Sequence, residues 1–251
     1  MSALATLTRT EATLFARNPQ SLFMGLFFPA VLLLVQGLVI PGTHDLVDAS
    51  GAQFAGLRVI DLFVPIALTV AMATVSLTNF PSAIGGYREN GVLRRLGATP
   101  VGAKRILLAQ LAVSAITLMA GAVIAVTAAI LLLGATTPSN IPLVCGAFVL
   151  GATSLLSLGA VIAARAGSAQ TANGTGTLLL FASLFTAGVW TPGPLMPDVL
   201  RTISAYTPLG AASNVLTAAW YSQPTPWIPV VVMAAFTAGL SVVAVRTFRW
   251  K

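Results

Sequence analysis

The chain has 251 residues, of which 57% are hydrophobic and only 8% are charged, and its formal net charge is +7. A soluble domain carries about a quarter charged residues, and a disordered chain has low hydrophobicity, so this composition excludes both classes. Since each bilayer crossing takes about 20 apolar residues, the chain holds about six crossings and leaves no room for a separate catalytic domain. Cys145 and His44 are the single cysteine and histidine, which excludes an intramolecular disulfide and a zinc site.

Six continuous apolar runs predict the fold. They lie at 21–40, 59–80, 106–134, 141–164, 174–190 and 227–245. Most reach the length of a spanning helix, the fifth falls about a residue short, and all are too continuous for barrel strands. The first run resembles a signal peptide only superficially, because its apolar region is too long and no clean cleavage site follows. The prediction is an all-α membrane protein: one transmembrane domain over residues 1–251 with six transmembrane helices.

The residues before the first run, 2–20, predict an interfacial helix. Four apolar side chains share one arc of this helix, namely Leu4, Leu7, Leu14 and Phe15. Arg9 and Arg17 lie off the arc, as expected at a membrane surface. Glu11 falls inside the apolar arc and counts against the prediction.

Residues 81–105 form a charged connection between the second and third runs. Within it, 97–105 reads GATPVGAKR, a near match to a phosphate-binding loop. It fails because Ala103 separates Gly102 from the lysine and Arg105 takes the place of the hydroxyl that would bind magnesium. Thr99 and Pro100 instead predict the start of the third membrane helix.

Small residues recur every four positions on the third and fourth runs. They are Gly121, Ala125 and Ala129 on the third run, and Ala147, Gly151, Gly159 and Ala163 on the fourth. Such spacing lets helix backbones approach closely. We expect these faces to pack inside one subunit, with contacts between subunits elsewhere.

A proline-rich connection, 191–226, separates the last two runs. Its semi-apolar part, 209–221, is too short to span a bilayer and predicts a re-entrant or interfacial helix.

The basic residues set the orientation. One set of connections contains Arg9, Arg17, Arg88, Arg94, Arg95, Lys104, Arg105, Arg165, Arg246, Arg249 and Lys251; the other contains Arg58 and Arg201. By the positive-inside rule, both termini are cytoplasmic in a multi-pass protein of the cell (plasma or inner) membrane. The same rule accounts for the positive charge, so no nucleic-acid partner is expected.

Ionisable residues inside the predicted spans are almost absent. Asp61 and Arg165 stand at helix ends, where an interfacial anchor or a local pair such as Arg58 with Asp61 explains them. A proton-coupled antiporter and an intramembrane protease are therefore improbable.

Residues 86–110 carry the most informative motif, GYRENGVLRRLGATPVGAKRILLAQ. A Glu and a Gly precede a short helix, and Thr-Pro precedes a new membrane helix, which resembles the signature of ABC-2 type transporter permeases. Two more stretches resemble this family: the first is Arg17, Asn18 and Pro19 followed by Pro29, and the second is Phe185, Gly188, Pro192, Pro197 and Pro208. The resemblance covers the whole chain and is closest to the drug exporters of the daunorubicin type.

The resemblance implies the membrane subunit of an ATP-driven exporter, not itself an enzyme. Its implied partners are two copies of a cytoplasmic ABC ATPase, which bind the ATP and magnesium, and a second permease chain, identical or similar. No cofactor is expected in this chain. The contact with the ATPase would be a cytoplasmic coupling helix between the second and third spans, with Leu93 and Leu96 as apolar knobs. Its further contacts would come from Glu89, Gly91, Arg94 and Arg95.

The implied substrate is a hydrophobic or amphipathic compound: a drug, an antibiotic or a lipid-like molecule. A path lined by aromatic residues would suit it, with Phe23, Phe27, Phe28, Phe181, Phe185 and Trp190 as candidates. The same side chains could instead face lipid or pack in the core. Two other functions stay open: an exporter of lipid-linked polysaccharide from the same family, and a secondary carrier or nontransporting membrane subunit.

Overall fold

The computed structural model describes residues 3–47, 56–99, 102–192 and 196–248, and every extended regular element in these ranges is a helix. The all-α prediction is therefore confirmed. In chain order the elements, in which η marks a π-helical segment, are α1 (Ala3–Ala16), α2 (Pro19–Leu22), η1 (Phe23–Phe27), α3 (Phe28–Val39), α4 (Val59–Ala73), η2 (Thr74–Asn79), α5 (Phe80–Glu89), α6 (Val92–Gly97), α7 (Ala103–Leu133), α8 (Ile141–Arg165), α9 (Ala169–Ala187), α10 (Asp198–Ala205), α11 (Pro208–Trp220) and α12 (Trp227–Thr247).

Within the described ranges, five helices are long and apolar enough to cross a membrane. They are Pro19–Val39, Val59–Glu89, Lys104–Leu133, Ile141–Arg165 and Trp227–Thr247. These helices confirm five of the six predicted runs. The fifth run forms α9, a helix of 19 residues that is not among them, so the sixth crossing stays a prediction.

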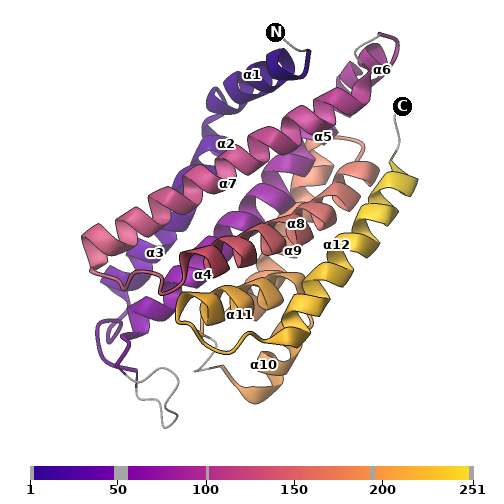
Figure 1. Ribbon diagram of the computed structural model, residues 1–251. Helices are drawn as coiled ribbons and strands as arrows, with labels where there is room; N and C mark the ends of the chain where they lie inside the picture. Colours follow the sequence, from indigo (N-terminus) through magenta and orange to yellow (C-terminus); the bar gives the residue numbers. More distant parts are fainter. Residues whose placement is uncertain (1–2, 48–55, 100–101, 193–195, 249–251) are drawn as a thin grey trace.

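The second long helix, formed by α4, η2 and α5, is the core of the bundle. Of its most apolar 18-residue window, 94% is buried, compared with 17% in α12. The helix is apolar on all sides over α4, and such a helix is stable only when other helices surround it. α3, α7, α8, α9 and α11 all pack against α4, and Figure 1 shows the long helices side by side around it.

Glycines let helices of the bundle approach one another closely, on the core helix and elsewhere. A Cβ atom added to Gly159 would lie 1.9 Å from the carbonyl oxygen of Ser76, and one added to Gly121 would lie 2.6 Å from that of Gly25. At Gly151 the nearest neighbours are the side chains of Ala212 and Met72, each 3.1 Å away. The prediction that these small residues pack inside one subunit is confirmed at these three positions.

A buried carboxylate joins the helices at the end of the bundle that holds α10 and α11. Asp61 is buried and accepts hydrogen bonds from the backbone N–H groups of Arg58 and Thr136, each at 2.9 Å. The Arg58 guanidinium lies 3.5 Å from the same carboxylate, so the predicted local pair is confirmed. The Trp220 indole N–H donates to the Thr136 carbonyl at 3.2 Å, which fixes the end of α11 against this corner.

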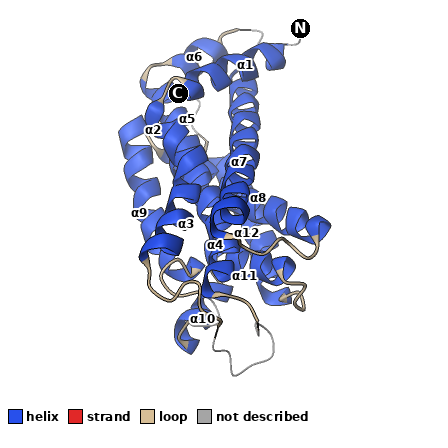
Figure 2. Cartoon of the chain, turned by 90° about the vertical axis from the view of Figure 1, so that its left-hand side faces the viewer, coloured by secondary structure: helices blue, strands red, loops and turns tan. Residues whose placement is uncertain are grey.

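The two termini lie at the opposite end, together with α1 and α6 (Figures 1 and 2). There α7 begins at Ala103 with Gly102 before it. The predicted helix start at Thr99 is therefore wrong: the Thr99 hydroxyl donates back to the Leu96 carbonyl at 2.8 Å and so closes the end of α6. Pro100, the other half of that prediction, lies outside the described residues.

Candidate functional site

A helix of six residues, α6, lies where the coupling helix was predicted. α5 ends as the Asn90 N–H donates to the Gly86 carbonyl at 3.0 Å. Gly91 then adopts a φ of +68°, a left-handed conformation that is strained for any residue with a side chain. This glycine turns the chain sharply, so that α6 starts at Val92 directly after α5.

The apolar side of α6 is seated on the bundle itself. Leu93 is 1% exposed. It belongs to a cluster with Phe80, Ile84, Ile106 and Ala163, and Val92 and Leu96 pack against this cluster with partial burial. In this conformation Leu93 contacts its own chain and is not accessible to another protein, so its role as a knob for a partner stays a prediction. Leu96 keeps part of its surface accessible.

Two arginines face outward from the seated helix. Arg94 and Arg95 are both exposed. Because they lie in the last turn of α6, their charges are also favourable beside the helix C-terminus. They give the helix a positively charged outer side.

Glu89, the last residue of α5, connects this helix to α9. Its carboxylate accepts a hydrogen bond from the backbone N–H of Ala169 at 3.2 Å, in the first turn of α9, where a negative charge is stabilised. α5 and α9 also touch directly, since a Cβ atom added to Gly85 would lie 2.5 Å from the Ser168 carbonyl oxygen. The end of α5 and the start of α9 are therefore in direct contact.

Arg88 has a structural role that the sequence analysis missed. Its guanidinium donates to the carbonyl oxygens of Ala163, at 2.8 Å, and of Ala166. These carbonyls end α8 and have no partner within the helix. The guanidinium also lies 5.3 Å from the centre of the Phe248 ring, so Arg88 ties α5, α8 and the chain after α12 together. A single sequence offers no signal for which arginine does this.

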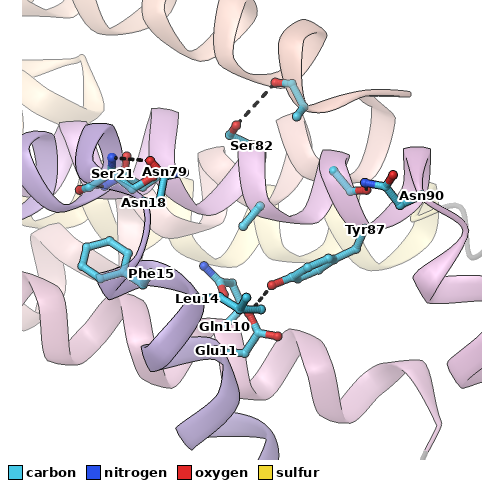
Figure 3. Close-up of a pocket in the computed structure, with 13 residues that line it drawn as sticks. Glu11, Leu14, Phe15, Asn18, Ser21, Asn79, Ser82, Tyr87, Asn90 and Gln110 are labelled. Carbon is cyan, nitrogen blue, oxygen red and sulfur yellow. Dashed lines mark hydrogen bonds between the residues drawn. The ribbon is translucent and has the colours of Figure 1, made fainter.

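Glu11, which counted against the prediction of an interfacial helix, holds the N-terminal helix α1 on the bundle. Glu11 is the one buried residue among those of α1, and the Tyr87 hydroxyl donates a hydrogen bond to its carboxylate (Figure 3). Burial raises the pKa of Glu11, and the hydrogen bond from Tyr87 partly opposes this effect. The position of Glu11 inside the apolar arc of α1 is thus explained by its contact with Tyr87 of α5.

Five of the six candidate aromatic side chains lie on the surface of the subunit. Phe23, Phe27, Phe181, Phe185 and Trp190 are between 43% and 64% exposed, whereas Phe28 is partly buried against the core. The rings of Phe185 and Trp190 lie 6.3 Å apart, centre to centre. The subunit by itself does not enclose these five side chains in a channel.

Long apolar helices around a buried central helix, with a short positively charged helix seated at one end, define a multi-pass membrane protein. The family profile of the ABC-2 type transporters matches residues 2–221. The chain belongs to the ABC-2 type transporter family, as the resemblance at residues 86–110 implies. Members of this family are membrane components of ABC transporters and act with an ABC ATPase. Among curated proteins, none matches this chain.

Proposed function

We propose that the chain is the permease subunit of an ATP-driven exporter, which moves a hydrophobic or amphipathic compound out of the cell. A separate ATPase, which binds the ATP and magnesium, drives it through α6. The observation that carries this proposal is the construction of α6: Leu93 fixes the helix to the bundle, while Arg94 and Arg95 are left exposed for a partner.

The path of force runs from α6 into the core. A push on α6 moves α5 through the tight turn at Gly91, and α5 moves α9 through Glu89. α5 is also continuous with the buried helix α4 through η2. A π-helical segment is a place where a helix can change its bend, so η2 allows the two halves to move relative to each other.

The proposed topology has six crossings, with α9 as the fifth. The end that holds α1, α6 and both termini faces the cytoplasm, because the connections there contain most of the lysines and arginines. α11 has 13 residues and is about 20 Å long, too short to span. It is therefore re-entrant from the outside.

The working unit contains a second permease chain, identical or similar, and two ATPase subunits. The exposed aromatic rings on η1 and α9 support this assembly. A path for an apolar compound has to be closed from the lipid, and a single chain leaves Phe27, Phe181 and Phe185 exposed. The second chain completes the path.

The experiment is a co-purification from native membranes with the permease carrying an affinity tag. The wild type retains an ABC ATPase. The double variant Arg94→Ala/Arg95→Ala reaches the membrane in normal amount, since both side chains are exposed, and retains at least about tenfold less ATPase because several charge-assisted contacts are lost. Arg246→Ala removes an exposed arginine from α12 at the same end of the bundle and retains wild-type amounts. Equal retention by the double variant and the control contradicts the proposed role of α6.

A further inference from the structure

A polar cavity of about 350 Å³ lies between α1, α5, α7 and the start of α9. It is separate from the exposed side of α6, and none of the six aromatic residues predicted to line a substrate path belongs to its lining. Seven of its lining residues have neutral polar side chains, namely Asn18, Ser21, Asn79, Ser82, Tyr87, Asn90 and Gln110. Figure 3 shows Glu11, Tyr87 and Gln110 close together on one side of this cavity and Asn18, Ser21 and Asn79 at its other end.

Two largely buried side chains in this cavity have hydrogen-bonding capacity that no described residue uses. Glu11 is 4% exposed and Gln110 is 5% exposed. Tyr87 donates to Oε2 of Glu11, while Oε1 accepts no hydrogen bond within the described part of the chain. The side-chain amide of Gln110 likewise makes no hydrogen bond to any described residue. Neither group is among the fully enclosed, unpaired side-chain atoms of the described residues, so both reach the space of the cavity. They are therefore available to a ligand that brings hydrogen-bond donors.

The charge of the lining selects a cation. Glu11 is the one charged residue among those that line the cavity, and no lysine or arginine is among them. An anion would be repelled by the carboxylate, whereas a cation would replace the water that burial has removed from it. Burial raises the pKa of Glu11, which agrees with a carboxylate that has no cationic partner among the described residues.

The lining suits an organic cation better than a bare metal ion. Calcium and magnesium sites use several oxygen ligands, commonly with more than one carboxylate, and the described residues contain no cluster of three or more metal-ligating side chains. Leu14, Phe15 and Ala83 add an apolar part to the lining, which suits a hydrocarbon chain. The aromatic rings of Phe15 and Tyr87 also favour a nearby positive charge.

We propose that this cavity binds the primary ammonium group of an amphiphile. Its N–H groups donate to Oε1 of Glu11 and to the side-chain carbonyl oxygen of Gln110, and its hydrocarbon part lies along Leu14 and Phe15. The inference extends the proposed function, from which it takes the position of the cavity at the cytoplasmic face of the membrane. The ammonium belongs either to the ethanolamine headgroup of a membrane lipid or to an amine-bearing transport substrate.

The test is calorimetric titration of the purified full-length permease with hexylamine, which is cationic at neutral pH, and with neutral hexanol. The wild type binds hexylamine at least about tenfold more tightly than hexanol, as expected for a hydrogen bond to a buried charge. Glu11→Gln, which keeps an acceptor for Tyr87, abolishes this preference. Asp198→Asn, a matched change at the far end of the bundle, keeps it.

A second variant guards against misfolding of the first. Gln110→Leu weakens hexylamine binding about three- to tenfold and leaves hexanol binding unchanged, because only the ammonium uses the amide oxygen. The proposal is overturned if the wild type shows no preference for the amine, or if the preference survives unchanged in the folded variants.

Two further arms distinguish the sources of the ammonium. If the occupant is the ethanolamine headgroup of a lipid, that lipid competes with hexylamine. Hexylamine then binds the permease more weakly in nanodiscs of phosphatidylglycerol with phosphatidylethanolamine than in nanodiscs of phosphatidylglycerol alone. Glu11→Gln abolishes this difference. If a transport substrate is the occupant, ethanolamine lipid has no effect and the wild type exports an amine-bearing amphiphile faster than its neutral counterpart. The titrations use the permease without ATPase or ATP. A failed titration therefore leaves the co-purification result intact, and a failed co-purification leaves the titration result intact.

Discussion

Single glycines determine how closely the helices approach the core. We predict that Gly159→Ala lowers the free energy of unfolding by about 2–3 kcal/mol or more, because overpacking a filled site forces the backbone to move. The added Cβ atom would lie 1.9 Å from the Ser76 carbonyl oxygen. Gly174→Ala is the matched control, a helical glycine with no neighbouring atom within 4 Å of the added carbon. Thermal unfolding of the purified variants measures the difference, and equal melting temperatures would contradict the observed packing.

Glu11 makes the stability of the protein depend on pH. Burial raises its folded-state pKa above the ordinary value of 4.5, so the folded protein binds the proton more tightly than the unfolded chain does. The stabilisation from protonated Glu11 is complete below about pH 4.5 and is lost as pH rises through the raised pKa. We predict that Glu11→Gln, which stays neutral, melts at a higher temperature than the wild type at neutral pH and that the difference shrinks as pH falls. Melting curves that differ by the same amount at every pH would show that Glu11 does not titrate differently in the folded state.

At the level of elements, Leu93 is what fixes α6 to the bundle. Leu93→Ala leaves a cavity in the cluster around Phe80, at a cost of about 2–5 kcal/mol, and we predict that α6 then separates from α5 more often. Amide hydrogen exchange over residues 92–97 should become faster in Leu93→Ala and stay at the wild-type rate in Arg94→Ala, whose side chain is exposed. Unchanged exchange in Leu93→Ala would mean that other contacts seat the helix.

The elements that the sequence predicted well are those with a continuous apolar run. Helix ends were less predictable. The second helix continues from the predicted residue 80 to Glu89, since α5 has a mixed composition and is held by tertiary contacts of Arg88 and Gly85. The π-helical segments were not predicted, although η1 contains Gly25 and a proline follows each segment, Pro29 after η1 and Pro81 after η2. A glycine or proline can end, kink or bulge a helix, and the outcome depends on neighbouring helices that one sequence does not place.

Across the whole molecule, the sequence predicted a short helix between the second and third runs but not how it packs on the bundle. The helix is present as α6, shortly after Glu89 and Gly91. The burial of Leu93 and the bond from Ala169 to Glu89 involve residues far away in the chain, which hydropathy does not relate to one another. Glu11 was visible only as an exception to the pattern of α1, and its partner Tyr87 was not predictable.

The central claim is that ATP hydrolysis by a partner drives transport through this chain. The most direct measurement reconstitutes the permease, together with the ATPase that co-purifies with it, in liposomes and follows the transport of a fluorescent hydrophobic compound. We predict transport that requires ATP and magnesium, is unaffected by collapse of ion gradients, and falls to background in Arg94→Ala/Arg95→Ala. Transport driven by a proton or sodium gradient in the absence of ATP would contradict the account.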